Sequence, residues 1–275
     1  MEYIELKGFE KHLTEEEKSA ATIEKYMRDV RYFLSFAGDR EIDKTLTIEY
    51  KSHLEQNYAI VSANSMIAAL NCYLRYMGMD KYYIRQFKIQ KQIYCSEEKE
   101  LTKAEYIRLV SAAKERGSER LSLLIETICG TGIRVSELQF VTVEAANRSE
   151  AVVSCKGKRR SVFIQSKLKK KLLKYAKAHE ITSGAIFITK TGKPMNRSNI
   201  WKEMKSLCER AGVNPGKVFP HNLRHLFART FYSIDKDIAK LADILGHSSI
   251  DTTRIYIIST GMEHRRRIER MRLVE

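Results

Sequence analysis

This 275-residue chain has no Cys-x-x-Cys pair and no long apolar run. Its five cysteines are odd in number, which argues against a disulfide framework and a structural zinc site and suits a reducing compartment. No apolar stretch approaches the ~20 residues that a membrane span requires. The segment from Met1 to Glu17 is acidic, whereas a cleavable signal is basic and then apolar. We therefore expect a soluble cytoplasmic protein with no membrane partner.

The net charge is unevenly distributed along the chain. Lys and Arg number 49 against 34 Asp and Glu, which gives a formal net charge of +15. Residues 1–100 hold 15 basic and 17 acidic residues, a net charge of −2, so the remaining 34 basic and 17 acidic residues carry +17. An excess of that size in one part of the chain indicates a polyanionic partner.

Residues 1–92 are expected to form a helical domain. Apolar side chains recur at helical spacing over residues 23–37, and Gly38 ends that run. A second amphipathic run covers residues 66–77, with Ser62 as its predicted start. These patterns are typical of a small helical bundle.

Residues 93–100 have no hydrophobic periodicity and are expected to be a linker. A second domain is predicted over residues 101–275. It opens with a capping box in which Thr102 and Glu105 start a helix. An apolar helix over residues 119–129 then leads into a Gly-Thr-Gly turn, which is typical of a helix C-cap.

A β-hairpin is predicted in this second domain. Two short β-like runs, residues 151–155 and 161–164, flank a basic turn that contains glycine. A basic helix is predicted over residues 167–179 and a third strand over residues 185–189, and nearly everything after them reads as helical. The predicted fold class is mainly α with a small β-sheet: a helical domain followed by a mixed α/β domain.

Most of the candidate catalytic residues lie in one segment, residues 220–257, which reads PHNLRHLFARTFYSIDKDIAKLADILGHSSIDTTRIYI. His221 and Arg224 are three residues apart, which places them on one face of a helix where they can grip one anion. His247 follows, and Tyr256 comes nine residues after it. A phenol, whose pKa is ~10, attacks well only where cations favour its phenolate. The combination indicates attack on a phosphodiester by a tyrosine.

Three motifs extend this reading to a family. GTGIRVSEL, HNLRH and LGHSSIDTTRIY resemble, in order and separation, the two arginine boxes and the nucleophile segment of tyrosine recombinases of the Xer and phage-integrase type. The resemblance spans most of residues 101–260. The catalytic residues that it implies are Arg134, Lys156, His221, Arg224, His247 and Tyr256.

Each implied residue has a chemical task. The guanidinium groups of Arg134 and Arg224 would neutralise the non-bridging phosphate oxygens. His221 would accept the tyrosine proton. The family's general acid is a lysine in a Gly-Lys-Gly turn; Lys156 matches it, although a cysteine replaces the first glycine, and Lys158 is an alternative two residues away.

Supporting roles follow for other positions. His247 would donate a hydrogen bond to a phosphate oxygen. Glu137 would orient Arg134, unless the two form only a surface pair. The Ser-Ser-Ile-Asp segment from Ser248 would cap the helix that presents Tyr256.

Further basic residues are predicted to contact DNA phosphates. Four of them are interleaved with aromatic residues at the end of the first domain, and three lie in the hairpin turn. They are Arg75, Lys81, Arg85, Lys88, Lys158, Arg159 and Arg160.

No cofactor or metal is expected. A phosphotyrosyl link conserves the energy of the broken bond, so the chemistry needs neither metal nor nucleotide. His221 and His225 imitate a zinc-binding pair at i,i+4, but the metalloprotease pattern requires Glu where Asn222 stands.

The resemblance implies an architecture and a partner. Two domains would clamp double-stranded DNA, and a free monomer would assemble as a homotetramer on paired sites. Strands would be exchanged through 3′-phosphotyrosine intermediates and a four-way junction. Residues 262–273 are predicted to form a helix that docks into a neighbouring protomer. No arm-binding domain is expected. The alternatives are a type IB topoisomerase-like enzyme and a non-catalytic DNA-binding relative.

Overall fold

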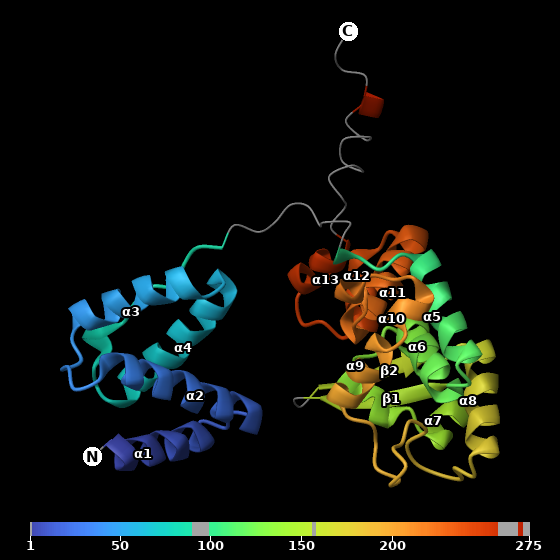
Figure 1. Cartoon of the computed structure of the whole chain (residues 1–275), viewed down its shortest axis with the longest axis horizontal. Coiled ribbons are helices and arrows are strands. Elements are labelled where there is room, and N and C mark those ends of the chain that lie inside the picture. The colour runs from blue at the N-terminus through green and yellow to red at the C-terminus, as the bar shows by residue number, and fades with distance from the viewer. Residues whose placement is uncertain (1, 90–98, 156–157, 258–268, 272–275) are drawn as a thin grey trace. The chain divides into compact units, whose positions relative to one another are not determined.

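The computed structural model describes residues 2–89, 99–155, 158–257 and 269–271 (Figure 1). The chain divides into two compact units, Met1–Lys91 and Gln92–Glu275. Both are built mainly from helices, and the described residues contain one two-stranded sheet. The predicted fold class, mainly α with a small β-sheet, is confirmed.

The first unit is a small helical bundle. Its elements are α1 (Glu2–Glu15), α2 (Ala20–Ala37), α3 (Lys44–Asn57), α4 (Ile60–Tyr76) and the 3-10 helix η1 (Asp80–Tyr82). Helix α4 packs against α1, α2 and α3, and its apolar face is buried in the core of the bundle. The largest side chains in that core are aromatic: Phe9, Phe33, Tyr50 and Tyr73.

In this unit, the predicted end of the first amphipathic helix is confirmed and the predicted start of the second is wrong. Helix α2 ends at Gly38, whose backbone N–H bonds to the carbonyl of Leu34, as predicted. The predicted start at Ser62 is wrong, because α4 begins at Ile60 with Ala59 as its N-cap and no side-chain cap. Ser62 therefore lies inside the first turn.

The second unit packs its helices around α6. The elements before the sheet are α5 (Lys103–Glu115), α6 (Glu119–Thr131), η3 (Val135–Phe140) and α7 (Val143–Arg148). The predicted capping box is present at the start of α5, since the side chains of Thr102 and Glu105 each accept the backbone N–H of the other. Helix α6 contacts α5, α8 and α11 and buries most of its residues.

The sheet is an antiparallel hairpin of β1 (Glu150–Cys155) and β2 (Lys158–Phe163), in which Val153 pairs with Arg160. Helix α8 (Ser166–Ala178) follows, one residue from its predicted bounds. The third strand predicted over residues 185–189 is wrong. Residues there form only isolated bridges, because Thr189 bonds to the carbonyl of Lys193 and the chain turns back on itself.

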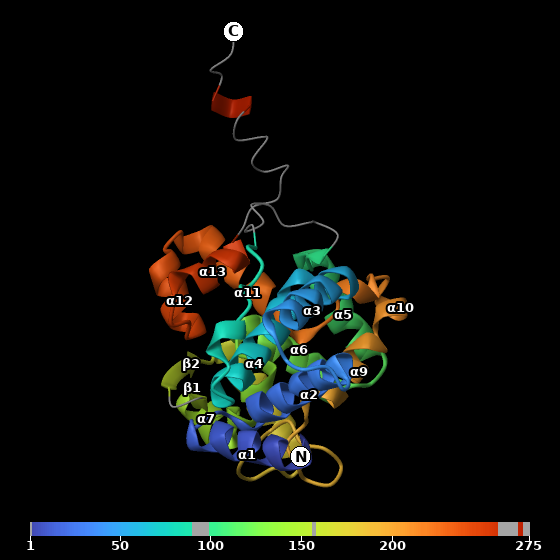
Figure 2. The same ribbon diagram turned by 90° about the vertical axis from the view of Figure 1, so that its left-hand side faces the viewer.

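The last part of the second unit is helical. It contains α9 (Arg197–Lys205), α10 (Cys208–Ala211), η4 (Pro215–Lys217), α11 (Pro220–Asp235), α12 (Ile238–Leu245) and α13 (Ile250–Ile257). Helices α11, α12 and α13 contact one another and lie together in both ribbon views (Figure 1, Figure 2). Their shared core contains Ala228, Leu241, Leu245 and Tyr256.

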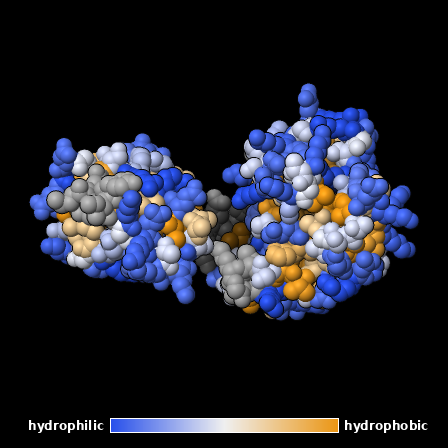
Figure 3. Space-filling view, turned by 90° about the horizontal axis from the view of Figure 1, so that it is seen from below, coloured by the Kyte–Doolittle hydropathy of each residue, from blue (hydrophilic) through white to orange (hydrophobic). Residues whose placement is uncertain are grey.

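The face of the molecule seen from below is mostly polar (Figure 3). Seen from below, hydrophilic residues cover much of both units, and apolar residues show in patches on the second unit (Figure 3). Within the described ranges, no helix combines the length and apolar character needed to cross a bilayer.

Candidate active site

Five of the six predicted catalytic residues converge in the second unit. Arg134 follows α6, His221 and Arg224 lie on α11, His247 lies between α12 and α13, and Tyr256 lies on α13. The sixth, Lys156, lies outside the described residues. The predicted helix over residues 262–273 also falls mostly outside them.

Arg224 forms the buried centre of the site. Its side chain is 1% exposed, and its guanidinium donates to the backbone carbonyls of Gly132 and Leu245 and to Nε2 of His247. Burial, followed by the charge of Arg134, lowers the pKa of Arg224 to about 10. It is still a cation near neutral pH. Its Nε–H is buried without a hydrogen-bond partner.

Glu137 holds two arginines with one carboxylate. Its Oε1 lies 2.9 Å from Nη1 of Arg134, and its Oε2 accepts from the Arg134 backbone N–H at 2.9 Å and from Nη2 of Arg160 at 2.6 Å. Burial alone would raise the pKa of Glu137. The Arg134 N–H and the charges of Arg160 and Arg134 outweigh it and hold that pKa below its usual value. Glu137 is 2% exposed, so the surface-pair alternative is wrong.

Gly132 is required at its position by both conformation and space. It ends α6 with a φ of +64°, in the left-handed region that favours glycine. A Cβ there would lie 2.5 Å from Cδ1 of Phe227. The Gly-Thr-Gly segment is therefore a helix C-cap, and it presents the carbonyl that Arg224 binds.

His247 connects Arg224 to the helix that carries the tyrosine. Nη2 of Arg224 lies 2.9 Å from Nε2 of His247, and Nδ1 of His247 lies 2.9 Å from Oγ1 of Thr253. Arginine can only donate, so Nε2 accepts and the Nδ1–H donates to Thr253. Burial, and then the charge of Arg224, lowers the pKa of His247 to about 4. In this arrangement His247 has no Nε2 proton to offer a phosphate.

Tyr256 is 6% exposed, and histidines surround it. Its hydroxyl lies 3.4 Å from Nε2 of His221. Its ring stacks on His225, with centroids 4.2 Å apart and planes at 26°. Partial burial and the charge of Arg224 lower the pKa of His221, and burial followed by His221 lowers that of His225 to about 4. Both rings are therefore neutral near pH 7 and can accept a proton.

The start of α13 is capped as the sequence suggested. The hydroxyl of Ser249 accepts the backbone N–H of Asp251 at 3.2 Å, and the Ser249 carbonyl accepts that of Thr252. This cap holds the first turn of α13, the helix that carries Tyr256.

The three basic residues predicted for the hairpin turn lie on β2 instead, because the strand begins at Lys158, and the side chains of Arg159 and Arg160 have different surroundings. The side chain of Lys158 lies outside the described residues. Arg159 is exposed, as a phosphate contact requires. Arg160 differs from that expectation, because its side chain is 12% exposed and is bound to Glu137 and to the Ile244 carbonyl.

The zinc alternative gains no support from the geometry. The rings of His221 and His225 meet edge to face at 4.8 Å. Across the described part of the chain, no three His, Cys, Asp or Glu side chains are grouped as a metal site would need.

In the first unit, two asparagines of α4 position the predicted DNA-contacting segment. The amide of Asn71 bonds both the N–H and the carbonyl of Ile84, at 3.2 and 2.9 Å, and that of Asn64 does the same for Phe87, at 2.7 and 2.9 Å. Arg85, one residue after Ile84, is exposed. Arg75, Lys81 and Lys88 are exposed as well.

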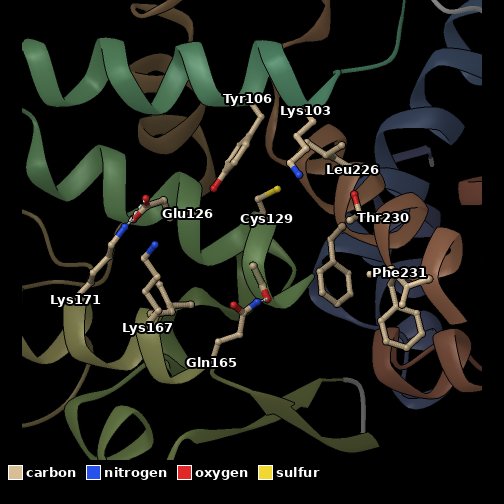
Figure 4. Close-up of a pocket in the computed structure, with 14 residues that line it drawn as sticks. Lys103, Tyr106, Glu126, Cys129, Gln165, Lys167, Lys171, Leu226, Thr230 and Phe231 are labelled. Carbon is tan, nitrogen blue, oxygen red and sulfur yellow. Dashed lines mark hydrogen bonds and ion pairs between the residues drawn. The ribbon is translucent and has the colours of Figure 1, made fainter.

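A cavity of about 570 Å³ lies between α5, α6, α8 and α11 (Figure 4). Lys103, Lys167 and the Glu126–Lys171 ion pair lie around it, and Gln165 bonds the Gly130 carbonyl at its wall. None of the predicted catalytic residues lines it. It is separate from the site around Tyr256.

Sequence reasoning did not mention Thr253, considered His225 only as half of a zinc-like pair, and gave Arg160 only a phosphate contact. Thr253 stands three residues before Tyr256, and His225 four residues after His221, so helical spacing alone indicated that each faces the site. The role of Arg160 had no such indication, because its partners Glu137 and Ile244 are distant in sequence.

Comparison with protein families gives two adjacent matches. Residues 99–262 match the phage integrase family, and residues 6–78 match the N-terminal SAM-like domain of phage integrases. The first match alone covers more than half of the chain and contains Arg134, Arg224 and Tyr256.

Individual relatives agree with this. Tyrosine recombinase XerA of Thermococcus kodakarensis is 30% identical over 98% of this chain and 96% of its own length. Tyrosine recombinase XerD of Vibrio cholerae is 29% identical over 82% of this chain and 76% of its own.

Solved structures show the same fold. The crystal structure of XerA recombinase is 25% identical with a TM-score of 0.55, and each chain is covered completely. A lambda integrase fragment, solved as a dimer bound to a COC′ core site, is 19% identical with a TM-score of 0.73. That match covers 93% of this chain and 94% of the other.

Proposed function

Because the chain belongs to the phage integrase family of tyrosine recombinases, we propose that it cleaves and rejoins double-stranded DNA at specific sites, with Tyr256 as the nucleophile. The observation that carries the proposal is the convergence of Tyr256, His221, His247 and two arginines, Arg134 and Arg224, in one site. A protein that only binds DNA has no need of a tyrosine among these groups.

The cleavage step balances with the residues at hand. The Tyr256 oxygen forms a bond to phosphorus while the bond from phosphorus to the 5′-oxygen breaks, which leaves a 3′-phosphotyrosine. His221 accepts the phenol proton, and Lys156 or Lys158 supplies a proton to the departing 5′-oxygen. Rejoining of the strands makes and breaks the same bonds in the reverse direction, so no metal or nucleotide is consumed.

The arginines supply the charge that this step requires. Each guanidinium has five N–H donors. Three hydrogen bonds to protein acceptors engage Arg224, and its buried Nε–H is unpartnered. A non-bridging phosphate oxygen would satisfy that donor. Loss of one such charge-stabilising donor typically costs about 3–4 kcal/mol of barrier, or 10²–10³ in rate.

Tyr256 must move before it attacks. In the structure its ring is enclosed by His225 and the core of α11 and α12. DNA binding would have to free the Tyr256 ring from this enclosure and bring a phosphate to Arg224, while the bond between His247 and Thr253 stays in place. A free protein with this arrangement would be inactive until DNA arrives.

The assembly that follows from family membership is a tetramer on paired sites. A lambda integrase tetramer bound to a Holliday junction has the same fold as this chain, with a TM-score of 0.73. By analogy, four protomers would exchange strands through a four-way junction, and residues 262–273 would dock into a neighbour. Truncation after Gly261 would then spare binding to a single site and abolish cooperative assembly on two.

Covalent capture tests the proposal. The recognition site would first be selected from random-sequence duplexes. A nicked suicide duplex that contains this site should then yield a protein–DNA adduct that survives denaturant, with Tyr256 as the linked residue. Tyr256→Phe should bind the duplex with unchanged affinity and give no adduct. An adduct in that variant would remove Tyr256 from its role.

A type IB topoisomerase-like reaction is the competing outcome. Such an enzyme would nick and reseal single duplexes without joining two of them. Paired sites should give four-way junctions with this protein when the second strand exchange is blocked. If the protein relaxes supercoiled DNA and forms no four-way junctions, the topoisomerase hypothesis is favoured.

A further inference from the structure

We propose that Arg160 is a positioning residue of the reaction: it fixes strand β2 of the hairpin, to which the candidate general acids Lys156 and Lys158 belong in sequence, against the arginine and histidine motifs. The inference rests on the cleavage chemistry proposed above. Arg160 lies on β2, two residues after the strand begins at Lys158. The sequence had suggested a phosphate contact for it.

The first support is the pairing of Arg160 with Glu137. Nη2 of Arg160 lies 2.6 Å from Oε2 of Glu137, and the two side chains are 12% and 2% exposed. The same carboxylate binds the backbone and the guanidinium of Arg134. One buried acid therefore sets the distance between the phosphate-binding Arg134 and strand β2.

The second support is a contact with the last turn of α12, the helix that precedes His247. Nη1 of Arg160 donates to the Ile244 carbonyl at 2.8 Å. Arg134 donates to the next carbonyl but one, that of Gly246, at 3.2 Å. The two arginines thus bind both Glu137 and the end of α12.

Gly246 makes room for the Arg160 side chain. A Cβ on Gly246 would lie 2.2 Å from Cδ and 2.7 Å from Nε of Arg160. Gly246 also has a φ of +64°, which favours glycine. The glycine of the Leu-Gly-His motif thus serves two purposes, a helix C-cap and a seat for the stem of Arg160.

These contacts leave Arg160 poorly placed to bind DNA as well. Its guanidinium already binds one carboxylate and one carbonyl, and its Nε–H, although it has no hydrogen-bond partner, is buried beside Gly246. The adjacent Arg159 is exposed and lies on the same strand. Arg159 is therefore a matched control for a basic residue that contacts phosphate.

The test compares Arg160→Gln with Arg159→Gln on two suicide substrates, one with an ordinary 5′-oxygen leaving group and one with a bridging 5′-thiol, which needs no proton. For Arg160→Gln we expect cleavage of the ordinary substrate to slow about 10²-fold at saturating DNA, since a misplacement near 1 Å can cost that much. The thiol substrate should recover most of that loss. Arg160→Lys should keep part of the activity.

The salt dependence of DNA affinity should separate the two variants in the opposite way. Arg159→Gln should lower the salt dependence of DNA affinity by about one phosphate contact, and the thiol substrate should recover none of any cleavage that this variant loses. Arg160→Gln should leave the salt dependence as it is. The reverse result, a lower salt dependence and normal saturated cleavage for Arg160→Gln, would overturn the inference. So would an equal loss on both substrates, which would restrict Arg160 to the support of Arg134.

Parallel variants keep the two proposals distinct. Lys156→Ala and Lys158→Ala identify the general acid by which of them the thiol rescues. Absence of an adduct from the wild-type protein overturns the cleavage chemistry and this inference with it. A wild-type adduct, a rescued lysine variant and an unaffected Arg160→Gln overturn the inference about Arg160 alone. If Arg160→Gln does not fold, the same comparison is made with Arg160→Lys, for which normal, unrescued cleavage also refutes it.

Discussion

The Nδ1 atom of His247 lies 2.9 Å from Oγ1 of Thr253, and this hydrogen bond joins the turn after α12 to the helix that carries Tyr256. Thr253 is fully buried, so no water competes for His247 there. Since His247 in turn accepts from Arg224, the position of α13 is tied to the phosphate-binding arginine. Because Arg224 can only donate, the proton of His247 is on Nδ1, and Thr253 accepts its hydrogen bond.

Thr253→Val should therefore weaken cleavage more than binding. Valine has the shape of threonine but cannot accept the Nδ1–H, and a buried donor left unpaired costs about 1–3 kcal/mol. We expect cleavage of the suicide substrate to fall about tenfold or more, with DNA affinity nearly unchanged, and Thr253→Ser to retain most of the activity. The neighbouring Thr252 is exposed, so Thr252→Val is the matched control and should cleave normally. Equal rates for the two valine variants would refute this role.

The neutral histidines around Tyr256 predict an acid-sensitive fold. The pKa values of His225 and His247 are lowered to about 4 from 6.5, so the unfolded chain binds protons that the folded protein does not. Their contribution to stability is complete above pH ~6.5 and is lost as the pH falls from ~6.5 toward ~4. The melting temperature of the protein should fall over that range.

His225→Phe tests this origin. Phenylalanine keeps the stack on Tyr256 but does not titrate, so the variant should lose less stability between pH ~6.5 and ~4.5 than the wild-type protein does. The measurement is thermal unfolding at several pH values. Identical pH profiles for the two proteins would show that the acid sensitivity arises elsewhere.

Sequence patterns predicted the elements whose determinants are local. The α5 capping box and the Gly38 stop depend on residues within four positions of each other, and both are present. The strand predicted over residues 185–189 failed because a turn between Thr189 and Lys193 prevents a ladder there. β-Propensity alone does not contain that information.

In the candidate site, too, local sequence patterns were predictive and contacts between distant parts of the chain were not. Family motifs identified Arg134, His221, Arg224, His247 and Tyr256, and the fold brings them together. The partners of those residues were harder to predict, because they depend on contacts across the fold. Arg160 reads as one of three basic turn residues in the sequence, yet it binds Glu137, which is 23 positions away.

Gly132, the second glycine of the Gly-Thr-Gly segment, differs from another left-handed glycine, Gly184, in the space around it. Gly132→Ala should be strongly destabilising, since it places a Cβ 2.5 Å from Phe227 at a φ of +64°. A left-handed non-glycine residue alone costs of order 1–3 kcal/mol. Gly184→Ala, at a φ of +76° with nothing within 4 Å, should show only this backbone cost. Urea unfolding of both variants separates the two contributions.

Gly130→Ala should behave in the opposite way. Gly130 lies inside α6, and a Cβ there would meet Gln165 and Leu168 at 3.7 and 3.8 Å, which is ordinary contact. Alanine is favoured over glycine in a helix interior by about 1 kcal/mol. We expect Gly130→Ala to be neutral or stabilising in the same urea assay. A destabilisation as large as that of Gly132→Ala would contradict the assignment of Gly132 alone as the conformationally required glycine.

The asparagine clasp in the first unit predicts a link between backbone order and DNA affinity. Asn64 and Asn71 are two helical turns apart on α4, about 10.5 Å along its axis, a distance that three residues of extended chain match between Ile84 and Phe87. Each amide replaces the two hydrogen bonds that a neighbouring strand would provide. The segment that carries Arg85 is held in place without a sheet.

Asn64→Ala should therefore free the backbone of Phe87 and leave the bundle folded. Hydrogen exchange should show loss of protection at the Phe87 amide, with the amides of α2 unchanged. Affinity for duplex DNA should fall about fivefold, since ordering one residue on binding costs ~1 kcal/mol or more. Asn57→Ala, which removes an exposed amide on α3, is the control and should change neither quantity. Full protection of Phe87 in Asn64→Ala would show that the clasp does not hold the segment, and lost protection with unchanged affinity would show that the segment does not contact DNA.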